Sequence, residues 1–237
     1  EVSLGADITT VREAKEFLEK VPHKIPYTGT SCCNSWTLMV KKLFPDQFEY
    51  ISDSASPMVE TAKYIKAKDP QAKVTFIGPC ISKKLEALRD DVKDYIHFVI
   101  TFEELMGMFV AKGIELSEIE VSKEIEDASA LGRGYAIATG VAEAVKKTAA
   151  AIDPSKEINV ECASTLHECV KLMKLAKAGK KNGYLLEGMA CQGGCIAGPG
   201  TLASFNRVRK AVTEFKNQAK AKSPLDNSII DENLRKI

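Results

Sequence analysis

The sequence predicts an α/β fold in which mostly parallel sheets are flanked by helices. Short apolar segments typical of strands alternate with longer segments of helical periodicity along the chain. The chain has 237 residues, 45% of them hydrophobic, which is enough for one large domain or two smaller lobes. It contains no internal repeat and no low-complexity tract, so this alternation defines the architecture.

Six segments are predicted strands because they are short, apolar and rich in β-branched or aromatic residues. They are "KIPYTG" (24–29), "KVTFIG" (73–78), "YIHFVI" (95–100), "YAIATG" (135–140), "EINVECA" (157–163) and "GYLLEGM" (183–189). Helical periodicity predicts helices before and between these strands and after the last one. The predicted helices cover residues 7–21, 34–44, 56–68, 82–91, 101–113, 140–152, 164–179 and 202–220.

The segment from Gly113 to Leu131 is acidic and has no strand pattern, so we expect it to connect two lobes. These lobes would cover approximately residues 1–125 and 126–237. The tail, residues 223–237, is expected to be a surface excursion. The sequence begins with Glu1 and enters an amphipathic helix at once, so we expect it to be part of a longer protein.

The charge of the chain is nearly balanced, with 33 basic and 32 acidic residues. This balance gives no reason to expect a nucleic acid or a membrane surface as a partner. No apolar segment approaches the roughly 20 residues of a membrane span, and there is no signal peptide. Seven cysteines cannot all pair, and cysteines in such an α/β chain more often indicate metal or redox chemistry. We therefore expect a reducing, cytoplasmic location.

Four cysteines fall at predicted strand-to-helix junctions, namely Cys33, Cys80, Cys191 and Cys195. Ligands of parallel α/β sheets bind at the carboxyl ends of strands, and helix N-termini favour anionic groups there. Four thiolates at this position suit either a [4Fe–4S] cluster or a Cys₄ zinc site. Structural zinc usually takes two tight pairs of ligands, whereas these four come from three separate loops, so the spacing favours the iron–sulfur cluster. Cys162 and Cys169 are expected to be small buried hydrophobic residues.

Three peptides resemble the signature loops of the [FeFe]-hydrogenase catalytic domain. They are "TSCCNSW" (30–36), "GPCISKKLE" (78–86) and "EGMACQGGCIAGPG" (187–200), and their order and spacing also match. The similarity begins at "GADIT" (5–9), includes "YAIATGVAEAV" (135–145) and runs through nearly the whole chain. The resemblance implies two lobes around a cluster site.

The family binds the H-cluster, a [4Fe–4S] cubane joined through one thiolate to a diiron unit with carbonyl, cyanide and bridging dithiolate ligands. The resemblance therefore implies a reversible reduction of protons to hydrogen. It implies that Cys33, Cys80, Cys191 and Cys195 hold the cubane, and that Cys195 bridges to the diiron unit.

The resemblance also assigns a proton path. Cys32 would donate protons to the amine of the bridging dithiolate, which is reasonable for a thiol whose unperturbed pKa is about 8.5. Glu13 and Glu16 lie three residues apart on one helix face and, with Ser52, match the family's proton relay to the surface.

Further residues around the diiron unit are implied in the same way. Lys83 would donate a hydrogen bond to one cyanide ligand, and Pro79 and Ser82 would contact the other. Met189 would place its thioether near the diiron unit, and Glu86 would anchor the loop by pairing with Lys83. Residues of this kind orient and tune a metal site.

The sequence also departs from the family pattern. Asn34 stands where the first loop usually has proline, Gly78 where the second usually has methionine, and the third loop continues as "IAGPGTL" (196–202). The family domain begins with a further strand and helix, so the sequence is interpreted as a divergent member that lacks the N-terminal part. No "CxxCxxC" run for an accessory cluster occurs.

The family implies electron delivery by ferredoxin or a similar carrier and assembly by hydrogenase maturation proteins. Two other functions remain open at this point. A hydrogen sensor would keep the cluster with slow turnover, and an iron–sulfur scaffold would bind a cubane without the diiron unit. Catalysis is favoured by the presence of Cys32, Glu13, Glu16 and Ser52, whereas the altered loops favour the sensor. Lys83 and Cys32 argue against the scaffold, because a plain cubane needs neither.

Overall fold

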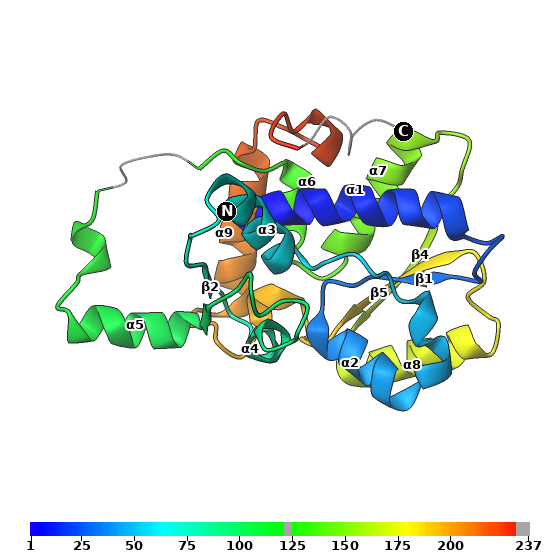
Figure 1. Ribbon diagram of the computed structural model, residues 1–237, viewed down its shortest axis with the longest axis horizontal. Helices are drawn as coiled ribbons and strands as arrows, with labels where there is room; N and C mark the ends of the chain where they lie inside the picture. The colour runs from blue at the N-terminus through cyan, green and yellow to red at the C-terminus, as the bar shows by residue number, and fades with distance from the viewer. Residues whose placement is uncertain (121–124, 231–237) are drawn as a thin grey trace.

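The computed structural model describes residues 1–120 and 125–230, in which helices flank two small parallel sheets (Figure 1). The strands are β1 (Thr28–Gly29), β2 (Thr75–Ile77), β3 (Phe98–Ile100), β4 (Asn159–Ser164) and β5 (Tyr184–Met189). The α-helices are α1 (Ser3–Lys20), α2 (Asn34–Leu43), α3 (Pro57–Lys68), α4 (Ser82–Ala87), α5 (Phe102–Ala111), α6 (Ala130–Gly134), α7 (Gly140–Ile152), α8 (Leu166–Lys177) and α9 (Phe205–Gln218). Short 3₁₀ helices are η1 (Pro45–Tyr50), η2 (Leu116–Glu118), η3 (Cys195–Ala197) and η4 (Pro224–Asp226).

The larger sheet has the strand order β1-β5-β4, and both pairs are parallel. Successive side chains of a strand point to opposite faces, and β5 shows this directly. Leu185 packs into the core with α1 and α7, whereas Leu186 packs into the core with α2 and α8. Figure 1 shows the two pairs of helices on opposite sides of the sheet. The predicted α/β architecture with parallel strands is confirmed.

The smaller sheet pairs β2 with β3 in parallel, in a register that places Thr75 opposite Phe98. Its own core is formed by α3 and by the segment around Val92 and Ile96. Figure 1 shows α4 and α5 beside this sheet, with α5 extending away from the rest of the molecule. Cys80 follows β2 by three residues, in the loop that leads from β2 to α4.

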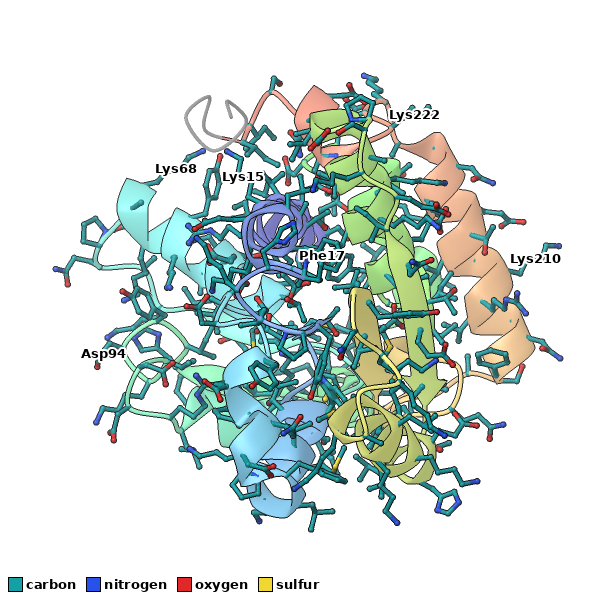
Figure 2. All side chains as sticks on the ribbon, turned by 90° about the vertical axis from the view of Figure 1, so that its right-hand side faces the viewer. Lys15, Phe17, Lys68, Asp94, Lys210 and Lys222 are labelled. Carbon is teal, nitrogen blue, oxygen red and sulfur yellow. The ribbon has the colours of Figure 1, made fainter. Side chains whose placement is uncertain are left out.

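Helix α1 is the central element of the fold. Residues 4–11 are all buried, and the helix packs between α3 and α7. Figure 2 shows Phe17 in the interior, while the labelled charged side chains Lys68 and Lys210 lie at the periphery. Asp7 and Glu13 are exceptions, because they are charged residues with no exposed surface. Buried carboxyl groups on a central helix require partners: Asp7 is bonded to Ser129 and Asn227, and Glu13 to Ser31.

The strand predicted at 135–140 is wrong. Helix α6 ends at Gly134, and residues 135–139 form a loop that runs across the segment containing Cys195. The Ala138 N–H donates to the carbonyl of Gly193 at 3.0 Å, and the Ile196 N–H donates to the carbonyl of Ala136 at 3.1 Å. Tyr135 is buried and residues 136–138 are half-buried against the third cysteine loop, and an apolar run of this kind does not distinguish a strand from a packed loop.

The expectation of a surface excursion at the tail is also wrong for the residues that the structure describes. Pro224, Asn227 and Ile230 are buried, and the Asn227 side-chain amide donates to the carboxylate of Asp7 at 2.9 Å. The tail therefore packs on α1. Residues 231–237 lie outside the described part of the chain.

The boundary between lobes predicted near residue 125 stays a prediction, but it does not follow the sheets. Strand β1 pairs with β5, and α2 packs on α8, so early residues belong to the sheet of the late strands. Within residues 1–120 and 125–230, no helix is both long enough and apolar enough to cross a membrane.

Candidate functional site

The predicted cysteine ligands lie on three loops that follow strands. Cys33 is the residue immediately before α2, which comes after β1. Cys80 lies between β2 and α4, and Cys191 and Cys195 follow β5, with Cys195 opening η3. Because β1 and β5 are parallel neighbours, their carboxyl ends bring the first and third loops to one edge of the sheet.

The four sulfur atoms lie within electrostatic range of one another. Burial raises the pKa of Cys195 to about 12, and the thiols of Cys33, Cys80 and Cys191 contribute to this rise. Burial followed by the thiols of Cys33 and Cys80 likewise raises the pKa of Cys191. Yet in the described ranges no three His, Cys, Asp or Glu side chains are close enough to hold a single metal ion. The four thiols, from three loops and close to one another, are nevertheless the donor type that a cubane takes.

A cavity of about 470 Å³ lies beside these thiols, and its walls are mostly apolar. Several of the predicted site residues line it together: Cys32, Pro79, Cys80, Lys83, Met189 and Cys195. Cys33 and Cys191 do not line the cavity. Two of the predicted ligands, Cys80 and Cys195, therefore border the cavity, and the other two do not.

Lys83 is held between the first and second cysteine loops. Its ammonium donates to Glu86 at 2.6 Å and to the backbone carbonyl of Cys32 at 3.1 Å, and Glu86 in turn accepts a hydrogen bond from Ser56. Burial lowers the pKa of Lys83, but the charge of Glu86, its hydrogen bond and the nearby cysteines together outweigh burial, and the pKa lies above its ordinary value. The lysine is therefore a fixed cation at the wall of the cavity, and the predicted pairing of Glu86 with Lys83 is present.

Ser82 does not line the cavity, in contrast to the neighbouring Lys83. Its hydroxyl accepts a hydrogen bond from the side-chain amide of Asn34 at 2.9 Å, and its carbonyl accepts a second at 3.1 Å. Asn34 is buried, so this bridge is shielded from water. The residue that departs from the family pattern in the first loop thus ties that loop to the second.

Glu13 lies at the inner end of the predicted proton path. Its Oε1 atom accepts hydrogen bonds from the N–H and the hydroxyl of Ser31 at 2.7 and 2.9 Å. Burial raises the pKa of Glu13 to about 7. Burial also raises the pKa of Cys32 well above its ordinary value, with Glu13 the next cause. A carboxyl group with a pKa near neutrality is well suited to exchange protons at physiological pH.

Ser52 and Glu16 lie at the outer end of the path. The Ser52 hydroxyl donates to Glu16 at 2.5 Å, and Glu16 also accepts from Lys20 at 2.8 Å. Both residues line a surface cleft of about 1320 Å³. No hydrogen bond connects Glu13 to Ser52 among the described residues. The structure therefore shows hydrogen bonds at each end of the predicted path but no direct bond between the ends.

Glu187 is a site residue that the sequence analysis did not single out. It is buried in β5, and its carboxylate accepts from the N–H groups of Thr139 and Ala142, each at 2.7 Å. Thr139 has a left-handed φ of 75°, which is unusual for a β-branched residue. Glu187 therefore fixes the start of α7 against the third cysteine loop. The signal in the sequence is a charged residue inside the apolar run "YLLEGM".

The two remaining cysteines lie in the hydrophobic cores. Cys169 is fully buried on α8 and directs its thiol at the carbonyl of Met189, 3.6 Å away. Cys162 is half-buried on β4 and packs against the core formed by α1 and α7. Neither lines the cavity beside the four-cysteine site.

Comparison with known proteins identifies one family. The iron only hydrogenase large subunit, C-terminal domain, matches residues 1–199. The chain is 27% identical to iron hydrogenase 1 of Clostridium pasteurianum over 84% of its own length and 42% of that protein. It is 26% identical to the periplasmic [Fe] hydrogenase large subunit of Nitratidesulfovibrio vulgaris over 86% of its length and 60% of that protein. The chain thus spans about half the length of these relatives.

The chain is also similar to a second kind of protein and to solved structures. The cytosolic Fe-S cluster assembly factor NAR1 of Kluyveromyces lactis is 29% identical over 51% of this chain and 27% of that protein. An [FeFe]-hydrogenase from a study of oxygen inactivation superimposes with a TM-score of 0.76 at 23% identity, covering 96% of this chain and 77% of that one. An apo HydA1 variant from Chlamydomonas reinhardtii gives a TM-score of 0.74 at 21% identity over the same shares. These structures establish the similarity of the fold.

Proposed function

Because this chain belongs to the family of C-terminal domains found in the large subunits of iron-only hydrogenases, we propose that it binds an H-cluster and catalyses the reversible reduction of protons to hydrogen. One observation carries the proposal. The cavity beside the four cysteines is lined by Cys32, Lys83 and Met189 as well as by Cys195. A cubane alone needs four thiolates and no adjoining cavity, so this arrangement favours a cluster with a second metal unit.

In this proposal Cys33, Cys80, Cys191 and Cys195 hold the cubane, and Cys195 borders both the cubane and the cavity. When bound, the cluster would supply the redox-active iron at which protons and electrons combine. Lys83, fixed as a cation by Glu86, would donate a hydrogen bond to an anionic ligand in the cavity. Pro79 and Met189 would shape its apolar wall and exclude water. Ser82 does not line the cavity, and its hydroxyl would instead accept the hydrogen bond of Asn34 that joins the first loop to the second.

The proton path in this proposal runs from the surface cleft to the cavity. Glu16 would take up protons in the cleft, and Ser52 would pass them inward through its hydroxyl. Glu13, with its pKa of about 7, would hold a proton at neutral pH and deliver it toward Cys32. The thiol of Cys32, at the cavity wall, would then be the last donor.

A cubane-binding protein without the diiron unit is a second candidate. It is favoured by the similarity to the cluster assembly factor NAR1, which covers about half of this chain. The four cysteines would serve both functions equally. Lys83 and Cys32 distinguish them, because only the larger cluster gives these two cavity residues a role. A hydrogen sensor would share the hydrogenase site and differ in its rate.

We further propose an external electron carrier of the ferredoxin type and assembly by hydrogenase maturation proteins. The cytoplasmic location predicted from the cysteines stays a prediction, since one of the relatives is periplasmic by name.

Hydrogen evolution from a reduced viologen dye under anaerobic conditions tests the proposal. The chain is loaded with the cubane and the diiron unit, and Cys32→Ala is compared with the unchanged protein. Because Cys32 would be the last proton donor, we expect its removal to lower the rate at least about 100-fold. Cys162→Ala is the matched control, because it removes a thiol outside the cavity, and it should leave the rate unchanged.

Slow evolution that Cys32→Ala does not alter would contradict the catalytic proposal and favour the sensor. Absence of evolution in a protein with an intact cubane would favour the cubane-binding alternative.

A further inference from the structure

Side-chain hydrogen bonds join the first and second cysteine loops on both sides of Cys33. On one side, the Asn34 side-chain amide donates to the hydroxyl of Ser82 at 2.9 Å and to its carbonyl at 3.1 Å. On the other side, the Lys83 ammonium donates to the carbonyl of Cys32 at 3.1 Å. These bonds fix the two loops against each other next to a predicted ligand of the cubane.

The same two residues of the second loop are bonded to the sulfur of the predicted ligand Cys80. Burial raises the pKa of the Cys80 thiol, while the backbone N–H groups of Lys83 and Ser82 donate to its sulfur and oppose that rise. Hydrogen bonds to a ligating sulfur are one of the factors that set the reduction potential of an iron–sulfur cluster. The position of Ser82 therefore affects the surroundings of the Cys80 sulfur.

Asn34 is the member of this arrangement that departs from the family pattern, in which proline is usual. Its side chain is buried, so water does not compete for its amide. A proline at this position has no side-chain donor and could bond to neither oxygen of Ser82. The bridge between the loops therefore depends on the asparagine of this chain.

We propose that Asn34 is a positioning residue that sets the reduction potential of the cubane, because it holds Ser82 and the N–H groups that face the Cys80 sulfur. This inference rests on the proposed function, since the cubane is the group that Cys33 and Cys80 would hold. One electron passes from the external carrier to the iron in this step, and no bond forms or breaks. The donors that Asn34 holds in place stabilise the negative charge that the electron adds.

Hydrogen–deuterium exchange in the chain without any cluster tests the bridge itself. Asn34→Leu keeps a side chain of similar volume and removes both hydrogen bonds to Ser82. We expect the backbone amides of residues 80–84 to exchange about tenfold faster in this variant, because the second loop opens more often. Unchanged exchange at residues 80–84 would overturn the inference.

Asn227→Leu is the matched control for this substitution. Asn227 and Asn34 are each 4% exposed. The Asn227 amide also donates two hydrogen bonds, to the carboxylate of Asp7 at 2.9 Å and to the carbonyl of Asp127 at 3.0 Å. The control therefore removes an equivalent bridge far from the cysteine loops in sequence. An equal increase in exchange at residues 80–84 in the control would also overturn the inference.

The reduction potential of the cubane tests the consequence of the bridge. The chain is reconstituted with iron and sulfide, without the diiron unit, and titrated with dithionite while electron paramagnetic resonance follows the reduced cluster. We expect Asn34→Leu to shift the potential to a more negative value, because the Cys80 sulfur loses ordered donors. Ser82→Ala removes only the hydroxyl acceptor, so its shift should have the same direction and be smaller. Asn227→Leu should leave the potential unchanged.

The double variant Asn34→Leu/Ser82→Ala separates one bridge from two independent effects. Its potential should shift no further than that of Asn34→Leu alone, because both substitutions act on the same bonds. Additive shifts, or an unchanged potential in Asn34→Leu, would overturn the inference. If Asn34→Leu holds no cubane, an unchanged potential in Ser82→Ala would overturn it instead. Failure of the unchanged chain to bind a cubane would count against the proposed function, and the exchange experiment would still test the bridge.

Discussion

Glu13 shows how a single buried side chain sets the chemistry of this site. In the unfolded chain its carboxyl group loses a proton near pH 4.5, whereas in the folded protein burial raises the pKa to about 7. Between these values the folded protein binds more protons than the unfolded chain, so its stability falls as the pH rises. The loss is complete above pH 7 and amounts to about 3 kcal/mol.

We therefore predict that Glu13→Gln removes this part of the pH dependence. The amide can still accept both hydrogen bonds of Ser31 but carries no charge. Urea unfolding at pH 5 and pH 8 should show a decrease in unfolding free energy that is smaller than in the unchanged protein by about 3 kcal/mol. Glu19→Gln is the control, because Glu19 is exposed and Lys24 lowers its pKa below this window. An undiminished decrease in Glu13→Gln would show that Glu13 ionises normally.

At the residue scale, the sequence predicted the cysteines from short signature peptides, and it predicted Glu13, Glu16 and Ser52 from the wider family resemblance. It did not identify the partners that hold them. Asn34 bonds to Ser82, 48 positions away, and Glu187 bonds to Thr139, also 48 positions away. Contacts of this kind depend on the tertiary fold, and they cannot be predicted from the residue type alone.

At the scale of the elements, the third cysteine loop and the loop at 135–139 form one unit. Gly194 has a φ of 94°, which favours glycine. A Cβ atom on Gly194 would collide with the backbone N of Ala138 and lie 2.7 Å from the carbonyl oxygen of Ala136. Since Gly194 precedes the predicted ligand Cys195, its close approach holds that ligand in place.

We predict that Gly194→Ala is more destabilising than Gly179→Ala, measured by urea unfolding. Gly179 also has a positive φ, of 75°, but a Cβ atom there would meet nothing within 4 Å. Its replacement should cost about 1 kcal/mol from the backbone alone. Gly194→Ala should cost about 2 kcal/mol or more in addition, because backbone atoms must move. Equal losses would contradict the close packing of the two loops.

The helices were predictable because amphipathic periodicity is a local signal, and all eight predicted helices are present, although α4 ends earlier than expected. The strands were less predictable. β1 contains only two residues, although six were predicted, because it pairs with β5 over a short distance and then turns into the site. The strand predicted at 135–140 is wrong because its apolar residues pack, partly buried, in a loop.

At the scale of the whole molecule, α1 connects the parts that build the site. It packs between α3 and α7, carries Glu13 and Glu16, and binds the tail through Asp7 and Asn227. The sequence predicted the parallel α/β class from its alternating pattern. It did not predict that residues 223–230 return to α1, because few apolar residues mark that segment and the hydrogen bond to Asp7 spans 220 positions.

The central claim is that one four-cysteine site holds an iron–sulfur cluster, and iron binding tests it most directly. After anaerobic reconstitution with iron and sulfide, iron and acid-labile sulfide are measured per chain, together with the absorption of the cluster. We predict about four iron atoms per chain, as a cubane requires. Alanine at Cys33, Cys80, Cys191 or Cys195 should strongly reduce this content, whereas Cys162→Ala and Cys169→Ala should retain it. Full retention of iron in the four variants, or equal loss in Cys162→Ala, would contradict the account.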